Sequence, residues 1–334
     1  MGAASLLVAS HHKYEVWAAK EELPINVAVE FTDHAASAYV AKQKGWFKEG
    51  GLKPTFYNYI TGLSLAAALS KGNIQAAYMC LLPAINAYAN AGVPIRIVAG
   101  LHRHGYGLAV NPENVKSVKD LEKPGIHIGS VQVGSPTDAI LLKTIEKYRL
   151  DRGKVLGKVR RMNPPMQIMA IKAGKLDASF SPEHWPAMAE DAGFSLLLSS
   201  QDVWPGMQGS VLIVRNDLLK NRPEVVQKLV EINEKSTKWI KENPEEAASI
   251  MAGQLQVTAD SIFPAEAEAA EAAAKLTITP VAIRRSMERL EYAVYVDAPA
   301  VQEAIDFAAR EGNIRKGFDA NDILDLRFVH ERRN

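Results

Sequence analysis

Residues 126–144 read IHIGSVQVGSPTDAILLKT and join an expected strand to an expected helix. Apolar residues alternate as far as Val133, and apolar residues at helical spacing begin at Ala139. Between them, Ser135 is a favourable N-cap, and Pro136 suits the first helical position because its missing N–H would have no partner there. The free N–H groups of such a helix start carry partial positive charge and can bind an anion. Taken alone, the stretch favours a well-capped connection without a ligand, because capping signals occur at most helix starts.

Strand and helix patterns alternate on both sides of this stretch. The expected strands are 25–29, 53–59, 75–79, 95–98, 155–161 and 178–180, and helical patterns follow most of them. Such alternation is typical of a mainly parallel α/β sheet covered on both faces, where ligands bind at the carboxyl ends of the strands. Two glycine-led strands, 105–110 and 209–214, bracket one α/β unit and are expected to form a hinge. Residues 216–334 have an almost entirely helical pattern.

The composition is that of a globular protein with balanced charge. The chain has 334 residues, 47% of them hydrophobic, which fits two domains better than one core. Lys and Arg total 39 against 38 Asp and Glu, so a nucleic-acid partner is not expected. Cys80 is the single cysteine and is interpreted as a small buried hydrophobe. His102 and His104 lie at strand spacing without an evident carboxylate or thiolate partner, so no metal site is expected.

Residues 1–23 form an expected leader with two open interpretations. The run GAASLLVAS is short and apolar and has no basic residue before it. It is either the remaining part of a secretory signal or a disordered lead. Elsewhere no run of 18 uninterrupted apolar residues occurs, and no transmembrane helix is predicted.

Three segments carry a resemblance to a known family: AKQKGWFKEGGL (41–52), LSKGNIQAA (69–77) and IKAGKLDAS (171–179). With them, residues 24–245 resemble the solute-binding proteins of ABC importers for nitrate, aliphatic sulfonates, taurine and thiamine pyrimidine precursors. The resemblance implies an α/β fold of the type II periplasmic-binding-protein class, with two lobes joined by two hinge strands and a helical C-terminal extension on lobe 1. It implies lobe 1 at residues 24–108 and 209–334 and lobe 2 at residues 109–208. It brings no catalysis and no cofactor.

The resemblance places the ligand contacts on strand-end loops that face the cleft, and it turns the helix start at 134–137 toward the ligand. The corresponding positions are Thr32, Asp33, His34, Thr61, Gly62, Cys80, Leu81, Gly134, Ser135, Thr137, Glu183, His184 and Trp185. Several family members have an acidic residue before the proline of the late turn, where this chain has Ser181, with Glu183 following instead. A carboxylate facing the ligand would favour a zwitterion or an amino-heterocycle. In the alternative interpretation, Glu183 points to solvent.

The expected function is that of an extracytoplasmic solute-binding protein. It would capture a small organic anion or zwitterion, such as a sulfonate or taurine, and deliver it to an ABC permease and its ATPase. The expected protein is monomeric, periplasmic or extracellular, and either free or tethered to a membrane. Phe31, Trp185 and Trp204 near the cleft leave open an aromatic heterocycle such as a thiamine pyrimidine precursor. A pyrimidine synthase of thiamine biosynthesis is a further alternative, but the cysteine-rich signature of that family is absent.

Overall fold

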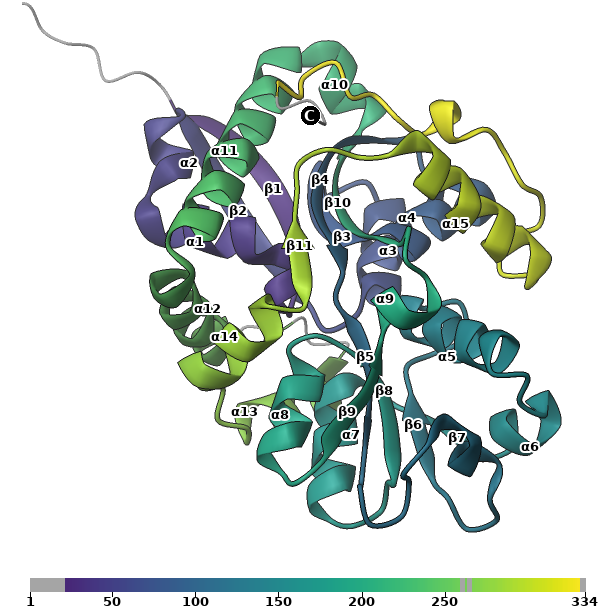
Figure 1. Ribbon diagram of the computed structural model, residues 1–334. Coiled ribbons are helices and arrows are strands. Elements are labelled where there is room, and N and C mark those ends of the chain that lie inside the picture. The colour runs from purple at the N-terminus through teal and green to yellow at the C-terminus, as the bar shows by residue number, and fades with distance from the viewer. Residues whose placement is uncertain (1–21, 259–261, 263–265, 331–334) are drawn as a thin grey trace, which may run out of the picture.

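Two α/β lobes, each built around one sheet, make up the molecule (Figure 1). The computed structural model describes residues 22–258, 262 and 266–330, so the expected leader lies almost entirely outside the described residues. The six-stranded first sheet has the order β11-β4-β10-β3-β1-β2, and the five-stranded second sheet has the order β7-β6-β8-β5-β9. The expected two-lobed α/β fold is confirmed.

The strands of the first sheet come from both ends of the chain, and those of the second sheet come from its middle. The first sheet contains β1 (Leu23–Glu30), β2 (Leu52–Tyr59), β3 (Ala76–Cys80), β4 (Ile95–His104), β10 (Gln208–Arg215) and β11 (Leu290–Tyr292). The second contains β5 (Tyr106–Val110), β6 (Ile128–Ser130), β7 (Val159–Arg161), β8 (Ala178–Pro182) and β9 (Ser195–Ser199).

Helices precede β5, lie between β5 and β10, and follow β10. The first group is η1 (Asp33–Ala35), α1 (Ala36–Lys44), α2 (Trp46–Glu49), α3 (Gly62–Ser70) and α4 (Leu81–Ala91). The second group is η2 (Val118–Glu122), α5 (Pro136–Lys147), α6 (Arg152–Leu156), α7 (Pro164–Lys172), α8 (Trp185–Asp191) and α9 (Ser200–Val203). The third group is α10 (Asn216–Asn221), α11 (Pro223–Glu242), α12 (Pro244–Thr258), α13 (Ala267–Ala274), α14 (Pro280–Met287), α15 (Ala298–Arg310) and η5 (Ala320–Asp322).

Strand β1 shows how the first sheet is buried on both faces. Val27 and Val29 belong to one hydrophobic cluster, together with residues of α1 and α11. Ala28 belongs to a second cluster, together with Leu65 of α3 and Ile85 of α4. Successive side chains of a strand point to opposite faces, so a strand covered on both sides needs a continuous apolar run, as in residues 27–29.

Both sheets are mixed, which corrects the expectation of a mainly parallel sheet. Strand β1 runs parallel to β2 and β3, and β6 runs parallel to β7 and β8. Strand β10 is antiparallel to β3 and β4, and β5 is antiparallel to β8 and β9. Strands β5 and β10 are the ones that directly follow a crossing between the sheets. Each therefore enters its sheet at the end where the parallel strands finish, and it must run in the opposite direction.

Within the described residues, the chain passes from one sheet to the other at two places. Strand β4 ends at His104 and β5 begins at Tyr106, so Gly105 alone separates the two sheets on the first crossing. The return crossing runs through residues 200–207, between β9 and β10. The first glycine-led strand thus lies wholly in the second sheet, and residue 108, where the first lobe was expected to end, lies inside β5. Gly105 has a φ of 80°, a conformation that favours glycine.

The helical C-terminal extension contacts both lobes. Helix α11 packs against α1 and α15 against α4, while α13 packs against α7 and α14 against α8. Arg285 of α14 forms ion pairs with Glu190 and Asp191 of α8 at 2.9 and 2.5 Å. An extension expected on lobe 1 therefore also links the two lobes along one side.

Most expected elements are present, but residues 155–161 are a partial error, and strands β9 and β11 were not predicted. Helix α5 begins at Pro136, and the N-cap Ser135 accepts a hydrogen bond from the Asp138 backbone N–H at 3.3 Å, as expected. Val155, however, lies in α6, and only Val159–Arg161 form a strand. Asp151 accepts a hydrogen bond from Lys154 N at 2.9 Å and caps α6, which overrides the strand-like apolar pattern.

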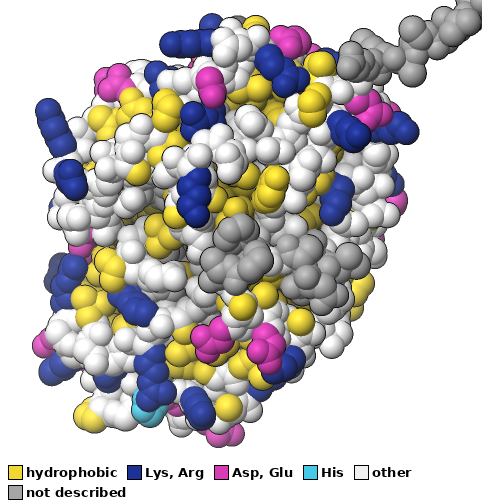
Figure 2. All heavy atoms as spheres, turned by 180° about the vertical axis from the view of Figure 1, so that it is seen from behind, with side chains coloured by type: hydrophobic (Ala, Val, Ile, Leu, Met, Phe, Trp, Pro, Cys, Tyr) yellow, Lys and Arg dark blue, Asp and Glu magenta, His cyan; other side chains and the backbone are white. Residues whose placement is uncertain are grey.

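The surface carries both signs of charge. Figure 2 shows Lys and Arg side chains spread over one face of the molecule with Asp and Glu among them. Within the described part of the chain, no helix combines the length and the apolar character needed to cross a membrane.

Candidate ligand site

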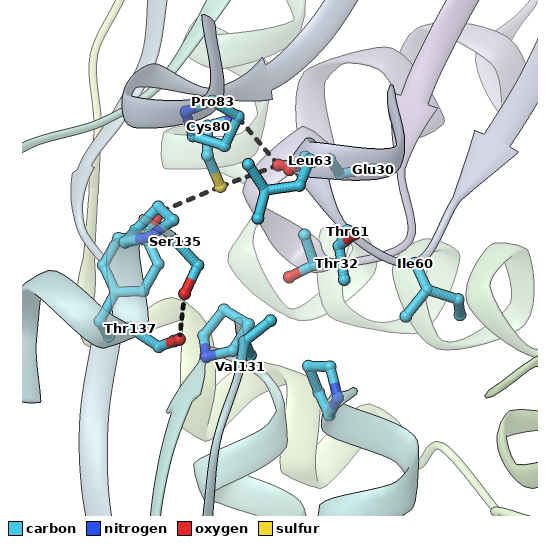
Figure 3. Close-up of a pocket in the computed structure, with 15 residues that line it drawn as sticks. Glu30, Thr32, Ile60, Thr61, Leu63, Cys80, Pro83, Val131, Ser135 and Thr137 are labelled. Carbon is cyan, nitrogen blue, oxygen red and sulfur yellow. Dashed lines mark hydrogen bonds between the residues drawn. The ribbon is translucent and has the colours of Figure 1, made fainter. Parts of the chain in front are cut away.

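A cavity of about 40 Å³ lies between the two lobes. This volume holds about three water molecules. The described residues that line it are Glu30, Thr32, Ile60, Thr61, Gly62, Leu63, Cys80, Pro83, Tyr106, Val131, Ser135, Pro136, Thr137, Pro164 and Pro182. Figure 3 shows Glu30, Cys80 and Thr61 on one side of this space and Ser135, Thr137 and Val131 on the other. Residues of both lobes thus line the cavity.

Four helices begin at the cavity. Thr61 is the N-cap of α3, Cys80 of α4 and Ser135 of α5, and Pro164 is the first residue of α7. The first N–H groups of a helix have no partner inside the helix, and their end of the helix carries partial positive charge. The cavity therefore receives positive potential from both lobes.

Local capping explains why α3 and α5 start where they do. Thr61 Oγ1 accepts a hydrogen bond from Ser64 N at 3.3 Å, and Ser135 Oγ accepts one from Asp138 N. Ser135 Oγ also lies 3.0 Å from Thr137 Oγ1, and both residues are buried. Hydroxyl groups at these helix starts add hydrogen-bonding capacity beside the N–H groups.

The helix starts supply the positive potential without a basic side chain. Among the described residues that line the cavity, none is Lys, Arg or His, and the titratable ones are Glu30, Cys80 and Tyr106. Helix starts arranged in this way can bind a small anion.

Glu30 and Cys80 are joined by hydrogen bonds in the cavity wall. Glu30 Oε2 accepts hydrogen bonds from the backbone N–H and the thiol of Cys80, both at 2.9 Å. Burial raises the pKa of Glu30 to about 7, although these hydrogen bonds lower it. Burial, followed by the nearby Glu30, raises the pKa of Cys80 well above its usual value. Tyr106 O–H donates to Cys80 Sγ at 3.0 Å.

Comparison with known proteins identifies the family. The model of the NMT1-like family matches residues 18–255, well over half of the chain. The chain belongs to the NMT1-like family. A similar curated protein from Brucella abortus is 26% identical over 238 residues, which cover 65% of this chain and 67% of that protein. The name of that protein describes it provisionally as a binding protein, and the name does not mention a ligand.

Solved structures confirm that this NMT1-like chain has the periplasmic-binding-protein fold. One is the ligand-binding component of an ABC-type import system from Staphylococcus aureus with zinc bound, with a TM-score of 0.74, 17% identity, and coverage of 92% of this chain and 97% of that one. Another is the alkanesulfonate-binding protein of Xanthomonas axonopodis bound to MOPS, with a TM-score of 0.74, 17% identity, and coverage of 92% and 99%. The family and the fold resemblance found in the sequence are confirmed.

The structure brings part of the expected site of this NMT1-like protein together. The expected residues that line the cavity are Thr32, Thr61, Gly62, Cys80, Ser135 and Thr137. Those that do not line it are Asp33, His34, Leu81, Gly134, Glu183, His184 and Trp185. Gly134 has a φ of 81°, and a Cβ there would lie 3.6 Å from the side chain of Asn313. It faces the C-terminal extension rather than the cavity.

Glu183, His184 and Trp185 form a buried cluster between the lobes. Glu183 is 1% exposed, and its Oε1 lies 3.5 Å from Arg289 Nη1, so it neither lines the cavity nor points to solvent. His184 Nδ1 lies 3.9 Å from Asp33 Oδ1, and the His184 ring lies 4.4 Å from that of Trp185. Asp33 also accepts a hydrogen bond from Ser286 Oγ of α14. These contacts hold the lobes and the extension together beside the cavity.

The residues that sequence analysis missed are mostly apolar, apart from Glu30 and Tyr106. The missed lining residues are Glu30, Ile60, Leu63, Pro83, Tyr106, Val131, Pro136, Pro164 and Pro182. A usable signal existed for Glu30, because a single carboxylate ends the otherwise apolar strand around Val27 and Val29. The sequence could not show which apolar residues line the cavity, because an apolar residue in a cavity wall has the same sequence pattern as one in the hydrophobic core.

The expected aromatic cluster is part of the core. The Phe31 and Trp185 rings lie 6.2 Å apart, and the Trp204 ring lies 5.1 Å from that of Phe307. Tyr106 is the one aromatic side chain among the described residues that line the cavity.

Proposed function

We propose that this NMT1-like protein is the extracytoplasmic solute-binding component of an ABC importer. In this proposal it captures a small organic anion, of the sulfonate or taurine kind, and delivers it to a permease and its ATPase. The binding names of the similar proteins support the role. The observation that carries the ligand class is the convergence of four helix starts on one cavity between the lobes.

The proposed lobes meet where the chain changes sheets. Gly105 and residues 200–207 are the two crossings, and we take them as the hinge. Ser135 and Thr137 of the second lobe would then approach Thr32 and Thr61 of the first lobe as the lobes close on the ligand. In this proposal the protein acts as a monomer, because both lobes that line the cavity belong to one chain.

The lining of the cavity favours a non-aromatic ligand. Of the described residues that line it, Tyr106 alone is aromatic, so a ring would find little aromatic surface on which to stack. Because Glu183 is held by Arg289 away from the lining, it gives no support to an amino-heterocycle. A small sulfonate or carboxylate therefore fits this site better than a thiamine pyrimidine precursor.

Calorimetric titration with a matched panel tests the proposal. The panel contains methanesulfonate, taurine, acetate and nitrate, their neutral analogues methanesulfonamide and acetamide, and a pyrimidine. We expect at least one anion to bind and its neutral analogue to bind at least tenfold more weakly. Binding of the pyrimidine or of the neutral analogues in preference to every anion would refute the proposed ligand class.

Thr137→Ala is expected to weaken anion binding at least tenfold, which corresponds to about 1.4 kcal/mol. The substitution removes a hydroxyl that lines the cavity at the start of α5, and it leaves the N-cap Ser135 in place. The free energy of unfolding of the ligand-free protein should change little. Titration of the variant with the tightest anion of the panel measures the effect.

A distant cap provides the control for Thr137→Ala. Asp151 caps α6 away from the cavity, where its Oδ1 accepts a hydrogen bond from Lys154 N at 2.9 Å, so Asp151→Ala should lower the stability of the protein through the lost cap. It should leave anion affinity unchanged. Equal affinities of the Thr137→Ala and wild-type proteins would show that the start of α5 is only a structural cap.

A further inference from the structure

Three potential metal ligands meet in the wall of the cavity. Glu30 ends β1, His34 lies in η1, and Cys80 ends β3. One ligand atom from each lies within 4.8 Å of the other two. Cys80 Sγ is 2.9 Å from Glu30 Oε2 and 4.0 Å from His34 Nδ1. All three residues are buried, and the fold brings them together from positions up to 50 residues apart.

The hydrogen bond between His34 and Gly105 determines which nitrogen of the His34 ring carries the hydrogen and which has an available lone pair. His34 Nε2 lies 2.7 Å from the carbonyl oxygen of Gly105. A carbonyl can only accept, so Nε2 carries the hydrogen and Nδ1 presents its lone pair on the side of Cys80. A metal-bound histidine is commonly held in this way, with its other nitrogen donating to a backbone carbonyl.

Among the described residues, the surroundings of Cys80 and Glu30 contain hydrogen-bond donors for the sulfur and no cation for the carboxylate. Tyr106 O–H and Ser210 O–H donate to Sγ at 3.0 and 3.7 Å, which suits a thiolate. Within the described part of the chain, Glu30 forms no ion pair with Lys, Arg or His. Buried carboxylates are ordinarily paired with a cation or bound to a metal.

We propose that Glu30, His34 and Cys80 bind one divalent transition-metal ion, with the donor set favouring Zn²⁺. Thiolate, imidazole and carboxylate are the ligands of zinc, whereas calcium and magnesium take oxygen ligands. Binding releases the thiol proton to solvent, together with any proton on Glu30. The two anionic ligands then balance the charge of the ion.

The fourth coordination position faces the cavity. Glu30 and Cys80 line the cavity, whereas His34 lies behind them, so an ion held by all three is open on the cavity side. Three protein ligands with one open position are the arrangement that lets zinc accept an exogenous ligand. This inference goes beyond the proposed function, because metal binding is measured without any organic ligand.

Cobalt titration of the full chain, after treatment with a chelator, tests the site. We expect one Co²⁺ per chain, with the visible bands of four-coordinate cobalt and a thiolate-to-cobalt charge-transfer band. Zn²⁺ should displace the cobalt. Cys80→Ser should remove the charge-transfer band, and Glu30→Gln and His34→Gln should each weaken affinity at least 100-fold. His127→Gln is the matched control, because it removes a His–carboxylate pair with Asp177 that lies outside the cavity.

A second measurement uses the wild-type protein and avoids any dependence on the folding of variants. Cys80 is the single cysteine of the chain, so a thiol reagent reports on it alone. Zn²⁺ should slow its modification at least tenfold, and a chelator should restore the rate. Unchanged reactivity together with no tight cobalt binding would overturn the metal site. That result would leave the anion panel unaffected, and failure of the panel would likewise leave the metal site standing.

Discussion

Gly100→Ala is expected to lower the free energy of unfolding by about 3 kcal/mol, the upper end of the usual cost of overpacking. Gly100 lies in β4, and a Cβ there would lie 2.8 Å from the carbonyl oxygens of both Ala293 and Tyr295. These are backbone atoms and cannot rotate away. Gly100 N also donates to Val294 O at 2.8 Å, so separating the segments to make room would lengthen that hydrogen bond. Urea denaturation followed by circular dichroism measures the loss.

Gly253→Ala is the matched control for Gly100→Ala. Gly253 lies in α12, and among the described residues no atom lies within 4 Å of a Cβ placed there. Alanine is the better helix former, so this variant should gain about 0.5 to 1 kcal/mol. Equal stabilities of the two variants would contradict the close approach of residues 293–295 to β4.

The stability of the wild-type protein is expected to fall as the pH rises from about 5 to about 8, with Glu183 as a main cause. Burial, against the opposing effect of Arg289 and with smaller contributions from Asp33 and Glu190, raises the pKa of Glu183 from 4.5 to about 8. The folded state therefore holds a proton that the unfolded chain releases above pH 4.5. This stabilisation is complete at low pH and is lost as the pH rises through 8, at up to about 1.4 kcal/mol per pH unit.

Glu183→Gln isolates the contribution of Glu183, because glutamine resembles the protonated carboxyl. The variant should match the wild type near pH 5 and become progressively more stable than it toward pH 8. Thermal unfolding at several pH values measures the difference. Glu288→Gln is the control, since Glu288 is exposed and pairs with Arg284 on the surface of α14. Parallel pH profiles of the wild type and Glu183→Gln would show that Glu183 is ionised throughout this range.

Local sequence signals predicted the elements, because their physical causes lie within a few residues. Ser135 and Pro136 fix the start of α5 through a cap and a preset backbone angle. The apolar run through Val27 and Val29 requires a strand covered on both faces. The same local signals cannot give strand direction, which depends on where the chain crosses between the sheets. The antiparallel β5 and β10 were missed for that reason.

The lining of the cavity was predicted only where its residues lie at strand ends or helix starts. Thr61, Ser135 and Thr137 follow from those positions. The surroundings of Cys80 depend on Glu30 and Tyr106, which reach it from other strands, so composition alone suggested an isolated hydrophobe. Glu183 was placed in the turn after β8, but its burial depends on Arg289, more than a hundred residues further along the chain.

The single-residue crossing at Gly105 sets the geometry of any motion between the lobes. A connection of one residue cannot lengthen. If one sheet rotates relative to the other, Gly105 must therefore stay nearly stationary, and the rotation axis must pass close to it. The return crossing through residues 200–207 is longer, so it can be displaced when the sheets rotate relative to each other. Because the Gly105 carbonyl accepts the His34 hydrogen bond, the axis of the proposed hinge would pass beside the cavity wall. Atoms there would then move least during opening, and those at the outer edges of the sheets would move most.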